Sequence, residues 1–277
     1  MEIVIIYLSL TGNTFRVAET ISSAFRKSGH SSRMVNLKNA TIGDVIEGDL
    51  IGFGTPCISS KAPTPIKSFL RSLPPIPGRN VFIFSTTGGA PGRVLSEISG
   101  ILVRKGANVL GDFSTHGQVN HPAPHLVGRF PNRPNSFDLD QAHQFALELS
   151  ARIAEEPSTP FPGKRNVGSI SNWGYFSLLG LISSDRVARV FLPKPRLDQF
   201  LCNQCKLCAD ECPMDNIFMN PKPIIGNKCI RCYRCFNVCP KKAFDVNWSF
   251  ADPFLRLLYN TYFIRWFGNL NPGEKIY

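Results

Sequence analysis

Short runs of apolar residues alternate along the first half of the chain with stretches in which apolar residues recur every three or four positions. The run Ile3–Tyr7 is unbroken, as is typical of a strand buried on both faces of a parallel sheet. Beyond it, Val17, Ile21 and Phe25 recur at helical spacing, and Gly29 ends the predicted helix. The chain therefore begins with a strand followed by a helix.

The same alternation continues for about 150 residues. Further strands are predicted at Arg33–Leu37, Leu50–Gly54, Val81–Ser85 and Asn108–Phe113. Helices are predicted at Thr41–Ile46, Pro65–Arg71, Gly92–Arg104 and Asp138–Glu155. Strands that alternate with helices predict an α/β fold with a doubly wound parallel sheet, in which ligands bind beyond the carboxyl ends of the strands.

Three loops leave the carboxyl ends of the predicted strands. The first, Ser9–Thr14, reads SLTGNT and leads into a helix, so backbone N–H groups, the helix dipole and hydroxyl groups can all face an anion. It has no lysine, which favours a monoester phosphate over a nucleoside triphosphate; a Ser/Thr-rich turn without a phosphate is the alternative. The other two loops are GTPCISSKAP, Gly54–Pro63, and STTGGAPG, Ser85–Gly92.

The second half of the chain holds two cysteine runs, CNQCKLCADECP from Cys202 and CIRCYRCFNVCP from Cys229, 27 residues apart. The spacing C-x2-C-x2-C-x3-C-P is typical of a bacterial protein that holds two [4Fe–4S] clusters, in which the fourth cysteine of each run ligates the other cluster. Zinc knuckles or a disulfide framework would not explain the third cysteine or the Cys-Pro pairs. The expected ligand sets are Cys202, Cys205, Cys208 and Cys239 for one cluster, and Cys229, Cys232, Cys235 and Cys212 for the other.

Composition limits the number of domains and the cellular compartment that can be expected. A length of 277 residues suits about two domains, and 43% hydrophobic content is enough for a buried core. Eight of the nine cysteines are expected ligands, which leaves Cys57 and indicates a reducing compartment. The apolar start lacks the basic flank of a signal peptide, and no run reaches the roughly 18 apolar residues of a membrane span. We therefore expect a soluble, cytoplasmic protein.

The net charge of +11 is unevenly distributed. Residues 1–156 hold 15 Lys and Arg against 12 Asp and Glu, whereas residues 157–277 hold 16 against 8. Two four-iron clusters, each about −2 with its thiolates, would cancel about half of the C-terminal excess. The remainder favours an acidic redox partner, and no motif for nucleic-acid binding accompanies it.

With these loops and strands, residues 1–156 resemble a flavodoxin, which implies a sheet of order 2-1-3-4-5 and an FMN site. The SLTGNT loop is similar to the phosphate loop of that family, and the other two loops are similar to those that bracket the isoalloxazine ring. The whole chain resembles flavodoxin–ferredoxin fusion proteins of anaerobic bacteria and archaea, which implies a small α+β bacterial ferredoxin-like domain after the flavodoxin. The FMN-binding residues that the resemblance implies are Ser9, Leu10, Thr11, Gly12, Asn13, Thr14, Thr55, Pro56, Cys57, Ile58, Ser59, Thr86, Thr87, Gly88 and Gly89.

One departure from the family concerns the flavin rings. Flavodoxins stack a Trp or Tyr on the flavin, but Thr55–Pro65 and Ser85–Gly92 contain no aromatic residue. An open face could admit a substrate, a partner or part of this chain. The candidate cover is the proline-rich stretch His116–Asn135, which holds His116, His121 and His125. Each histidine is either a solvated loop residue or a proton donor.

We expect four segments: a flavodoxin-like domain (1–156), a linker with a short apolar stretch (157–196), a ferredoxin domain (197–247) and an aromatic tail (248–277). The linker begins in the Pro/Ser/Gly-rich stretch Glu155–Gly168. The tail carries crowded aromatic and aliphatic residues on one predicted helix. That helix could lie on a membrane surface or in a partner groove, or it could pack against Trp173–Ile182.

Pairing FMN with two clusters predicts an electron-transfer protein that converts between one- and two-electron redox partners. Clusters of this type work at low potential, on the order of −400 mV, which suits anaerobic metabolism. Two alternatives stay open: an FMN-dependent reductase of a small molecule, fed by the clusters, and the soluble arm of a membrane redox complex. A reductase would need a placed proton donor, for which the histidine loop is the candidate.

Overall fold

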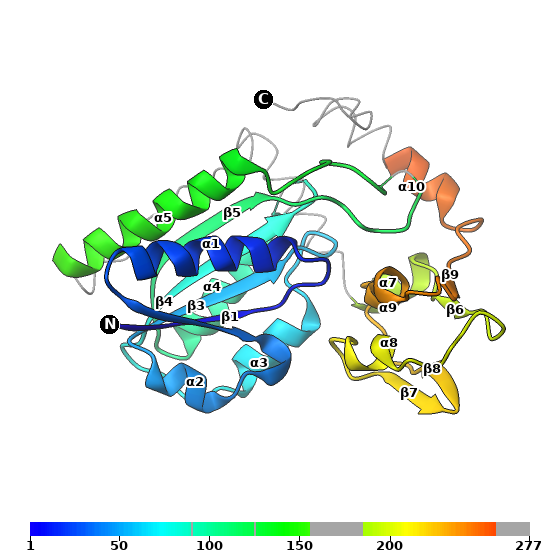
Figure 1. Cartoon of the computed structure of the whole chain (residues 1–277), viewed down its shortest axis with the longest axis horizontal. Helices are drawn as coiled ribbons and strands as arrows, with labels where there is room; N and C mark the ends of the chain where they lie inside the picture. The colour runs from blue at the N-terminus through cyan, green and yellow to red at the C-terminus, as the bar shows by residue number, and fades with distance from the viewer. Residues whose placement is uncertain (90, 125, 156–184, 259–277) are drawn as a thin grey trace. The chain divides into compact units, whose positions relative to one another are not determined.

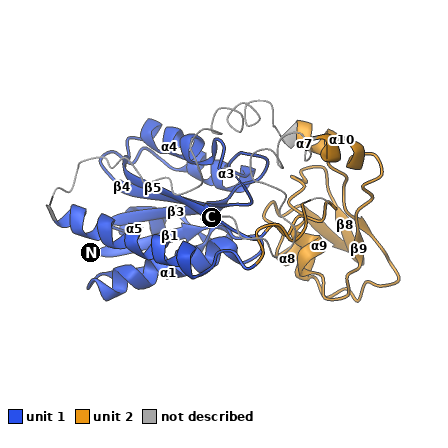
Figure 2. Ribbon diagram, turned by 90° about the horizontal axis from the view of Figure 1, so that it is seen from above, with its two compact units in different colours: residues 1–118, 132–180 blue, residues 119–131, 181–277 orange. Residues whose placement is uncertain are grey.

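The computed structural model describes residues 1–89, 91–124, 126–155 and 185–258. It divides into two units, each of which is discontinuous in sequence (Figures 1 and 2). Of the described residues, unit 1 comprises 1–118 and 132–155. Unit 2 comprises 119–131 and 185–258. A stretch that lies inside the predicted flavodoxin sequence thus belongs, in space, with the cysteine-rich unit.

Unit 1 is built on five parallel strands in the order β2-β1-β3-β4-β5. This order confirms the predicted doubly wound sheet. The strands are β1 (Glu2–Tyr7), β2 (Ser31–Asn36), β3 (Leu50–Pro56), β4 (Asn80–Thr87) and β5 (Asn108–His116). The last three run beyond their predicted ends, because each is held to the end by pairing with its neighbour. His116, expected in a loop, is therefore the last residue of a strand.

The helices of unit 1 lie on both faces of the sheet. They are α1 (Asn13–Lys27), α2 (Ile42–Glu47), α3 (Thr64–Ser72), α4 (Val94–Arg104) and α5 (Ser136–Glu155), with a 3-10 turn η1 (Leu37–Asn39) after β2. Figure 2 shows α1 and α5 on one face and α3 and α4 on the other. Both faces are covered, which explains why the central strands β1 and β3 are mostly apolar and buried.

One cluster of core residues in unit 1 lies between the sheet and the pair α1 and α5. Phe82 and Phe84 of β4 are fully buried there, and the ring of Phe82 contacts those of Phe25 and Phe145. The neighbouring strand accommodates these rings only because Gly54 lies beside Phe84: a Cβ there would come within 2.2 Å of the ring. The side chains of β4 thus require a glycine in β3.

Unit 2 has little regular structure. Its described helices are α7 (Asp185–Phe191), α8 (Leu207–Asp210), α9 (Arg234–Val238) and α10 (Asp252–Leu258), and its strands are β6 (Arg196–Leu197), β7 (Ile217–Asn220), β8 (Lys222–Ile225) and β9 (Phe244–Asp245). The strands form two antiparallel pairs, β6 with β9 and β7 with β8. This is the small α+β, cysteine-rich domain that the sequence predicts.

Three expectations concern segments that are not described. The linker from Glu155 to Gly168 and the apolar stretch Trp173–Ile182 lie outside the described residues, except for Glu155 itself, and so does the tail beyond Leu258. Within the described ranges, no helix combines the length and the apolar character needed to cross a membrane.

Candidate functional site: two redox centres

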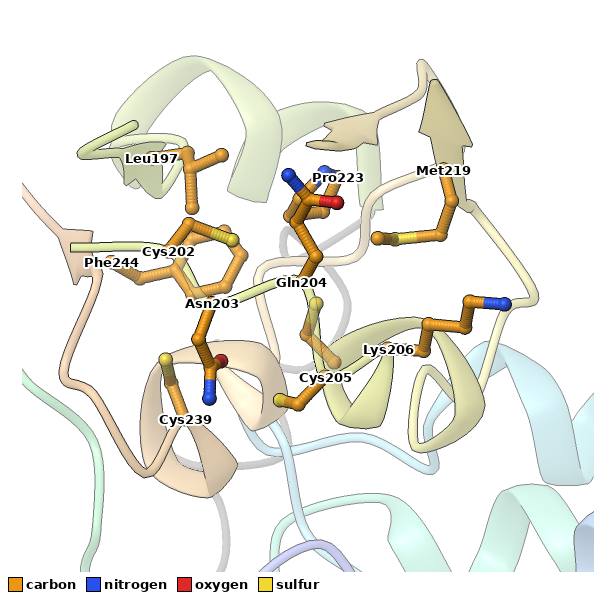
Figure 3. A pocket seen from close by; sticks show the side chains of 11 residues that line it. Leu197, Cys202, Asn203, Gln204, Cys205, Lys206, Met219, Pro223, Cys239 and Phe244 are labelled. Atoms are coloured by element: carbon orange, nitrogen blue, oxygen red, sulfur yellow. The ribbon is translucent and has the colours of Figure 1, made fainter. Parts of the chain in front are cut away.

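The first cysteine run curves around a pocket in unit 2. Cys202 and Cys205 lie in the loop before α8, and Cys208 lies within α8. The same pocket is lined by Cys239, 27 residues beyond Cys212 and just after α9 (Figure 3). The structure therefore brings together the four cysteines that the sequence assigns to one cluster, including the one from the other run.

The second run folds in the same way. Cys229 and Cys232 precede α9, and Cys235 lies within it. Burial raises the pKa of the Cys232 thiol to about 12, and the nearby charges of Cys229 and Cys212 raise it further. Cys212 of the first run is thus within electrostatic reach of the second set, as the predicted exchange of fourth ligands requires.

The thiols in both sets fit a cationic group. Among the described residues, no three His, Cys, Asp or Glu side chains are close enough to hold a single metal ion; the four cysteines of the first set instead line a pocket. Burial raises the pKa of Cys208 to about 11 and also raises that of Cys235. Buried thiols with raised pKa values become thiolates only when a strong positive charge lies beside them, and iron supplies such a charge.

Backbone hydrogen bonds complete the environment of the two exchanged cysteines. The N–H of Asn216 donates to Cys212 Sγ at 3.4 Å, and the N–H of Ala243 donates to Cys239 Sγ at 3.3 Å. Each donor lies four residues after its cysteine, so the repeat extends to the hydrogen bonds. Donors of this kind stabilise negative charge on cluster sulfurs. No sequence pattern predicts these donors, because any residue except proline can supply the N–H.

In unit 1, the SLTGNT loop joins β1 to the N-terminus of α1. Gly12 caps the helix with φ 91°, a left-handed conformation that favours glycine, and the first turn holds no acidic residue. Ser9 Oγ accepts a hydrogen bond from the N–H of Phe15 at 3.2 Å. The positive end of a 15-residue helix therefore meets a loop of neutral donors.

Hydrogen bonds connect this loop to the two others. Thr14 Oγ1 and Thr86 Oγ1 share a buried hydrogen bond of 2.8 Å, and the N–H of Cys57 donates to the carbonyl of Thr86 at 2.8 Å. Asn13 Nδ2 donates to the carbonyl of Gln118, just after β5, at 2.8 Å. The three loops that the sequence singled out therefore meet at the carboxyl edge of the sheet, where a doubly wound fold binds its ligand.

The loops differ in how open they are. Thr55, Thr86 and Thr87 are buried, whereas Ile58–Ser60 forms a turn in which Ser59 and Ser60 have positive φ. Gly92 lies against this turn, since a Cβ there would come within 2.5 Å of the Ser60 carbonyl oxygen. The second and third loops are therefore packed against each other.

Two titratable groups in or beside these loops have shifted pKa values. Burial raises the pKa of the Cys57 thiol to about 11, so the thiol stays protonated at neutral pH and does not behave as a nucleophile. Burial lowers the pKa of His116 to about 4, with Arg133 acting in the same direction. His116 is therefore neutral near pH 7.

A buried carboxylate that the sequence pattern does not single out bonds to the chain on both sides of the histidine loop. Asp138, 2% exposed, accepts hydrogen bonds from Thr115 Oγ1 at 2.6 Å and from Arg133 Nη1 at 2.6 Å. It also accepts the N–H of Asn135, whose side chain accepts the N–H of Asp138 in return. This reciprocal pair is the only sequence-visible signal, an Asn-x-x-Asp at the start of a helix.

The histidine loop does not behave as one piece. His116 belongs to unit 1, but His121 lies in unit 2, where its ring is 4.6 Å from that of Tyr233 and 5.4 Å from that of Trp248. His125 lies outside the described residues. His121 thus packs against residues of the cysteine-rich unit.

The five-stranded sheet with its three converging loops and the twofold cysteine repeat define a two-unit redox protein, one unit for a phosphorylated cofactor and one for iron. Comparison with protein families agrees: a flavodoxin domain matches residues 4–158, and a 4Fe-4S dicluster domain matches residues 194–240. The chain belongs to the flavodoxin family and carries a 4Fe-4S dicluster ferredoxin domain behind its flavodoxin domain. This pair of domains implies electron transfer with FMN and two [4Fe–4S] clusters.

Individual relatives match parts of the chain. An uncharacterized protein of Methanocaldococcus jannaschii is 43% identical over 56 residues, which are 20% of this chain and 22% of that protein. A flavodoxin of Megasphaera elsdenii is 28% identical over 110 residues, which are 39% of this chain and 80% of that protein. Thus the chain matches only about a fifth of the first relative's length.

Solved structures resemble the first unit. An archaeal flavodoxin is 17% identical with a TM-score of 0.46, and the match covers 56% of this chain and 99% of that one. Flavodoxin 1 of Bacillus cereus is 17% identical with a TM-score of 0.44, over 55% of this chain and 98% of that one.

Proposed function

We propose that this protein passes electrons between one FMN and two [4Fe–4S] clusters and so connects two-electron with one-electron redox partners. FMN supplies transfer of one or two electrons, and each cluster supplies transfer of one. The observation that carries the proposal is the presence of both arrangements in one chain: loops converging on a helix N-terminus in unit 1, and two four-cysteine sets in unit 2.

We propose that unit 1 binds FMN through all three loops. Ser9–Thr14 would hold the phosphate, with backbone N–H groups at the start of α1 supplying most of the donors, since Thr14 and Asn13 are already bonded to Thr86 and Gln118. Thr55–Ser59 and Thr86–Gly89 would flank the ring system. In this arrangement Asn13 and Thr14 both position the phosphate loop and bind the phosphate.

For the clusters, we propose the exchanged ligand sets stated above. Cys212→Ser should then damage the cluster held by Cys229, Cys232 and Cys235, whereas Cys208→Ser, the matched control, should damage the other. The two clusters are distinguished by electron paramagnetic resonance of the reduced protein. Damage to the same cluster by both substitutions would show that the fourth cysteines are not exchanged.

The experiment that tests the whole proposal is a cofactor count followed by a reductive titration, both anaerobic. We expect about eight iron, about eight sulfide and one FMN per chain, and uptake of about four electrons. Reduction with a two-electron donor should bleach the clusters as well as the flavin. Zinc in place of iron, or clusters that stay oxidised while the flavin is reduced, would contradict the proposal.

Partner choice rests on charge. Residues 157–277 carry 16 basic against 8 acidic side chains, so we propose that the one-electron partner is an acidic redox protein. Its association rate should fall steeply as salt is raised, because screening weakens attraction between charged surfaces. A rate independent of salt would exclude electrostatic recognition.

A further inference from the structure

The two cysteine runs can be compared residue by residue, because their spacing is identical. Lys206 in the first run corresponds to Tyr233 in the second, and Gln204 corresponds to Arg231. The backbone corresponds as well: φ is 60° and 59° at Gln204 and Arg231, and 65° and 54° at Lys206 and Tyr233. The two loops therefore have the same shape, and only their surroundings differ.

The loop of the first run is open to solvent. Every residue from Asn203 to Leu207 is exposed, including the ligand Cys205. Just before the run, Phe200 is 99% exposed. We call the cluster expected at Cys202, Cys205, Cys208 and Cys239 the outer cluster.

The loop of the second run is covered. Tyr233 is 1% exposed and Ile230 is 6% exposed. Part of the cover is the chain after α7: Arg231 Nε donates to the carbonyl of Leu192 at 3.0 Å, and the Tyr233 hydroxyl donates to that of Pro193 at 2.9 Å. We call the cluster expected at Cys229, Cys232, Cys235 and Cys212 the inner cluster.

The rest of the cover comes from Val119–Pro131, which we call the strap. Its ends are held together by backbone hydrogen bonds between Val119 and Arg129 at 2.9 Å and between Gly128 and Val119 at 3.0 Å. His121 lies edge-on to Tyr233 and near Trp248, and the Tyr233 and Trp248 rings are 5.7 Å apart. The strap is thus seated on the loop that carries the inner ligands.

A second contact fixes the strap to the helix between two ligands. Asn237 Nδ2, in α9, donates to the carbonyl of Asn120 at 3.0 Å. Asn237 stands two residues after Cys235 and two before Cys239. The strap therefore contacts unit 2 on both the loop and the helix of the second run.

We propose that the strap, through His121, keeps water from the inner cluster and so gives it a lower reduction potential than the outer cluster. A cluster becomes more negative on reduction, and a less polar environment penalises the added charge. The cover on Tyr233 thus disfavours the reduced form on the inner side only. With both clusters bound, an electron on unit 2 would then favour the outer ligand set, and its transfer would oxidise one cluster and reduce the other without a bond or proton change.

This inference rests on the proposed function and adds a direction to it. Electrons that arrive on unit 2 collect at the exposed loop around Cys205, where an external redox protein can approach most closely. His121 acts as a positioning residue in this scheme: it touches Tyr233 and not a ligand.

The test is a redox titration of the full, cofactor-loaded chain, followed by electron paramagnetic resonance. Wild type should show two potentials, and Cys232→Ser should identify the inner signal. In His121→Ala the reduction potential of the inner cluster should rise by at least about 59 mV, which is a tenfold change in the oxidised-to-reduced ratio for one electron. The potential of the outer cluster should not change. His143→Ala, which removes a histidine from α5, should change neither.

A second variant separates shielding from simple loss of structure. His121→Phe retains an aromatic ring on Tyr233 and should keep the inner potential low, even if His121→Ala proves unstable. Equal potentials in the wild type, an inner potential above the outer one, or an inner potential unmoved in His121→Ala would overturn the inference while leaving the cofactor count, and hence the proposed function, intact. Absence of iron would instead remove the proposed function itself.

Discussion

The flavodoxin unit and the ferredoxin unit bury different kinds of interior. The first has a continuous apolar core in which Phe25, Phe82 and Phe84 are fully buried. In the second, two of the four buried core residues are Cys208 and Cys235, which we propose as cluster ligands, with Cys212 and Cys239 packed against them. The comparison suggests that unit 1 is held together mainly by apolar burial, whereas unit 2 depends on its iron–thiolate bonds.

Removal of iron should therefore break one unit and spare the other, and this is the largest effect we expect. Anaerobic chelation should abolish hydrogen-exchange protection throughout unit 2, since its small core cannot offset the loss of the metal bonds. Protection in β1, β3 and β4 should persist. Retention of protection around α8 and α9 in iron-free protein would show that unit 2 is stable without its clusters.

The reverse experiment removes apolar burial from unit 1. Phe82→Ala should lower the free energy of unfolding of unit 1 by about 3–5 kcal/mol, because Phe82 is fully buried among aromatic rings. Urea unfolding followed by far-UV circular dichroism measures this change, and the cluster signals should stay as in wild type.

Phe137→Ala is the matched control on α5. Its side chain is 62% exposed, so its substitution should change the free energy of unfolding by less than about 0.5 kcal/mol. Equal losses at the two positions would mean that unit 1 is not held by its core.

Loss of FMN, in contrast with loss of iron, should leave the fold intact. Asn13→Ala combined with Thr14→Ala removes the hydrogen bonds to Gln118 and Thr86 that set the phosphate loop, and should weaken FMN binding roughly 10- to 100-fold. Flavin fluorescence on dilution measures the dissociation constant. Thr20→Ala, on the same helix and half-buried, removes a hydroxyl bonded to the carbonyl of Arg16 and serves as control. FMN release only together with unfolding would refute the distinction.

The smallest effect concerns acid. Because burial lowers the pKa of His116 to about 4, the unfolded chain binds more protons than the folded one between about pH 6.5 and 4. The stability that His116 contributes is complete above pH 6.5 and is lost as the pH falls towards 4. Wild type should therefore lose about 1–2 kcal/mol more than His116→Gln between pH 7 and 5.

Urea unfolding of the full chain at each pH, monitored at the flavin, measures the acid effect. Parallel pH profiles for wild type and His116→Gln would show that His116 is not kept neutral by burial.

Much of unit 1 could be predicted from the sequence because its information is local. Apolar runs such as Ile3–Tyr7 predict buried strands, and the SLTGNT loop predicts a phosphate site within six residues. In unit 2 the cysteine spacing is a local signal of the same kind. The strand ends depend on distant residues: β5 continues to His116 because His116 pairs with Thr87 of β4, a contact that local pattern does not encode.

What the sequence did not reveal depends on residues far apart in the chain. His121 lies 112 positions before Tyr233, and nothing in the repeat indicates that one loop is covered and the other open. The carboxylate of Asp138 likewise accepts hydrogen bonds from Thr115 and Arg133, and only folding brings these donors beside it. Pattern and spacing predict which cysteines are ligands, but not the environments of these cysteines.

The strap also constrains how the protein can be made and divided. Val119–Pro131 is synthesised well before the cysteine runs. The flavodoxin unit can therefore form its sheet before the residues that the strap contacts have been made. A cut between residues 156 and 184 would give a flavodoxin fragment that carries the strap and a ferredoxin fragment without it. Although each unit has its own core, the two are therefore not independent modules that can be exchanged by a single joint.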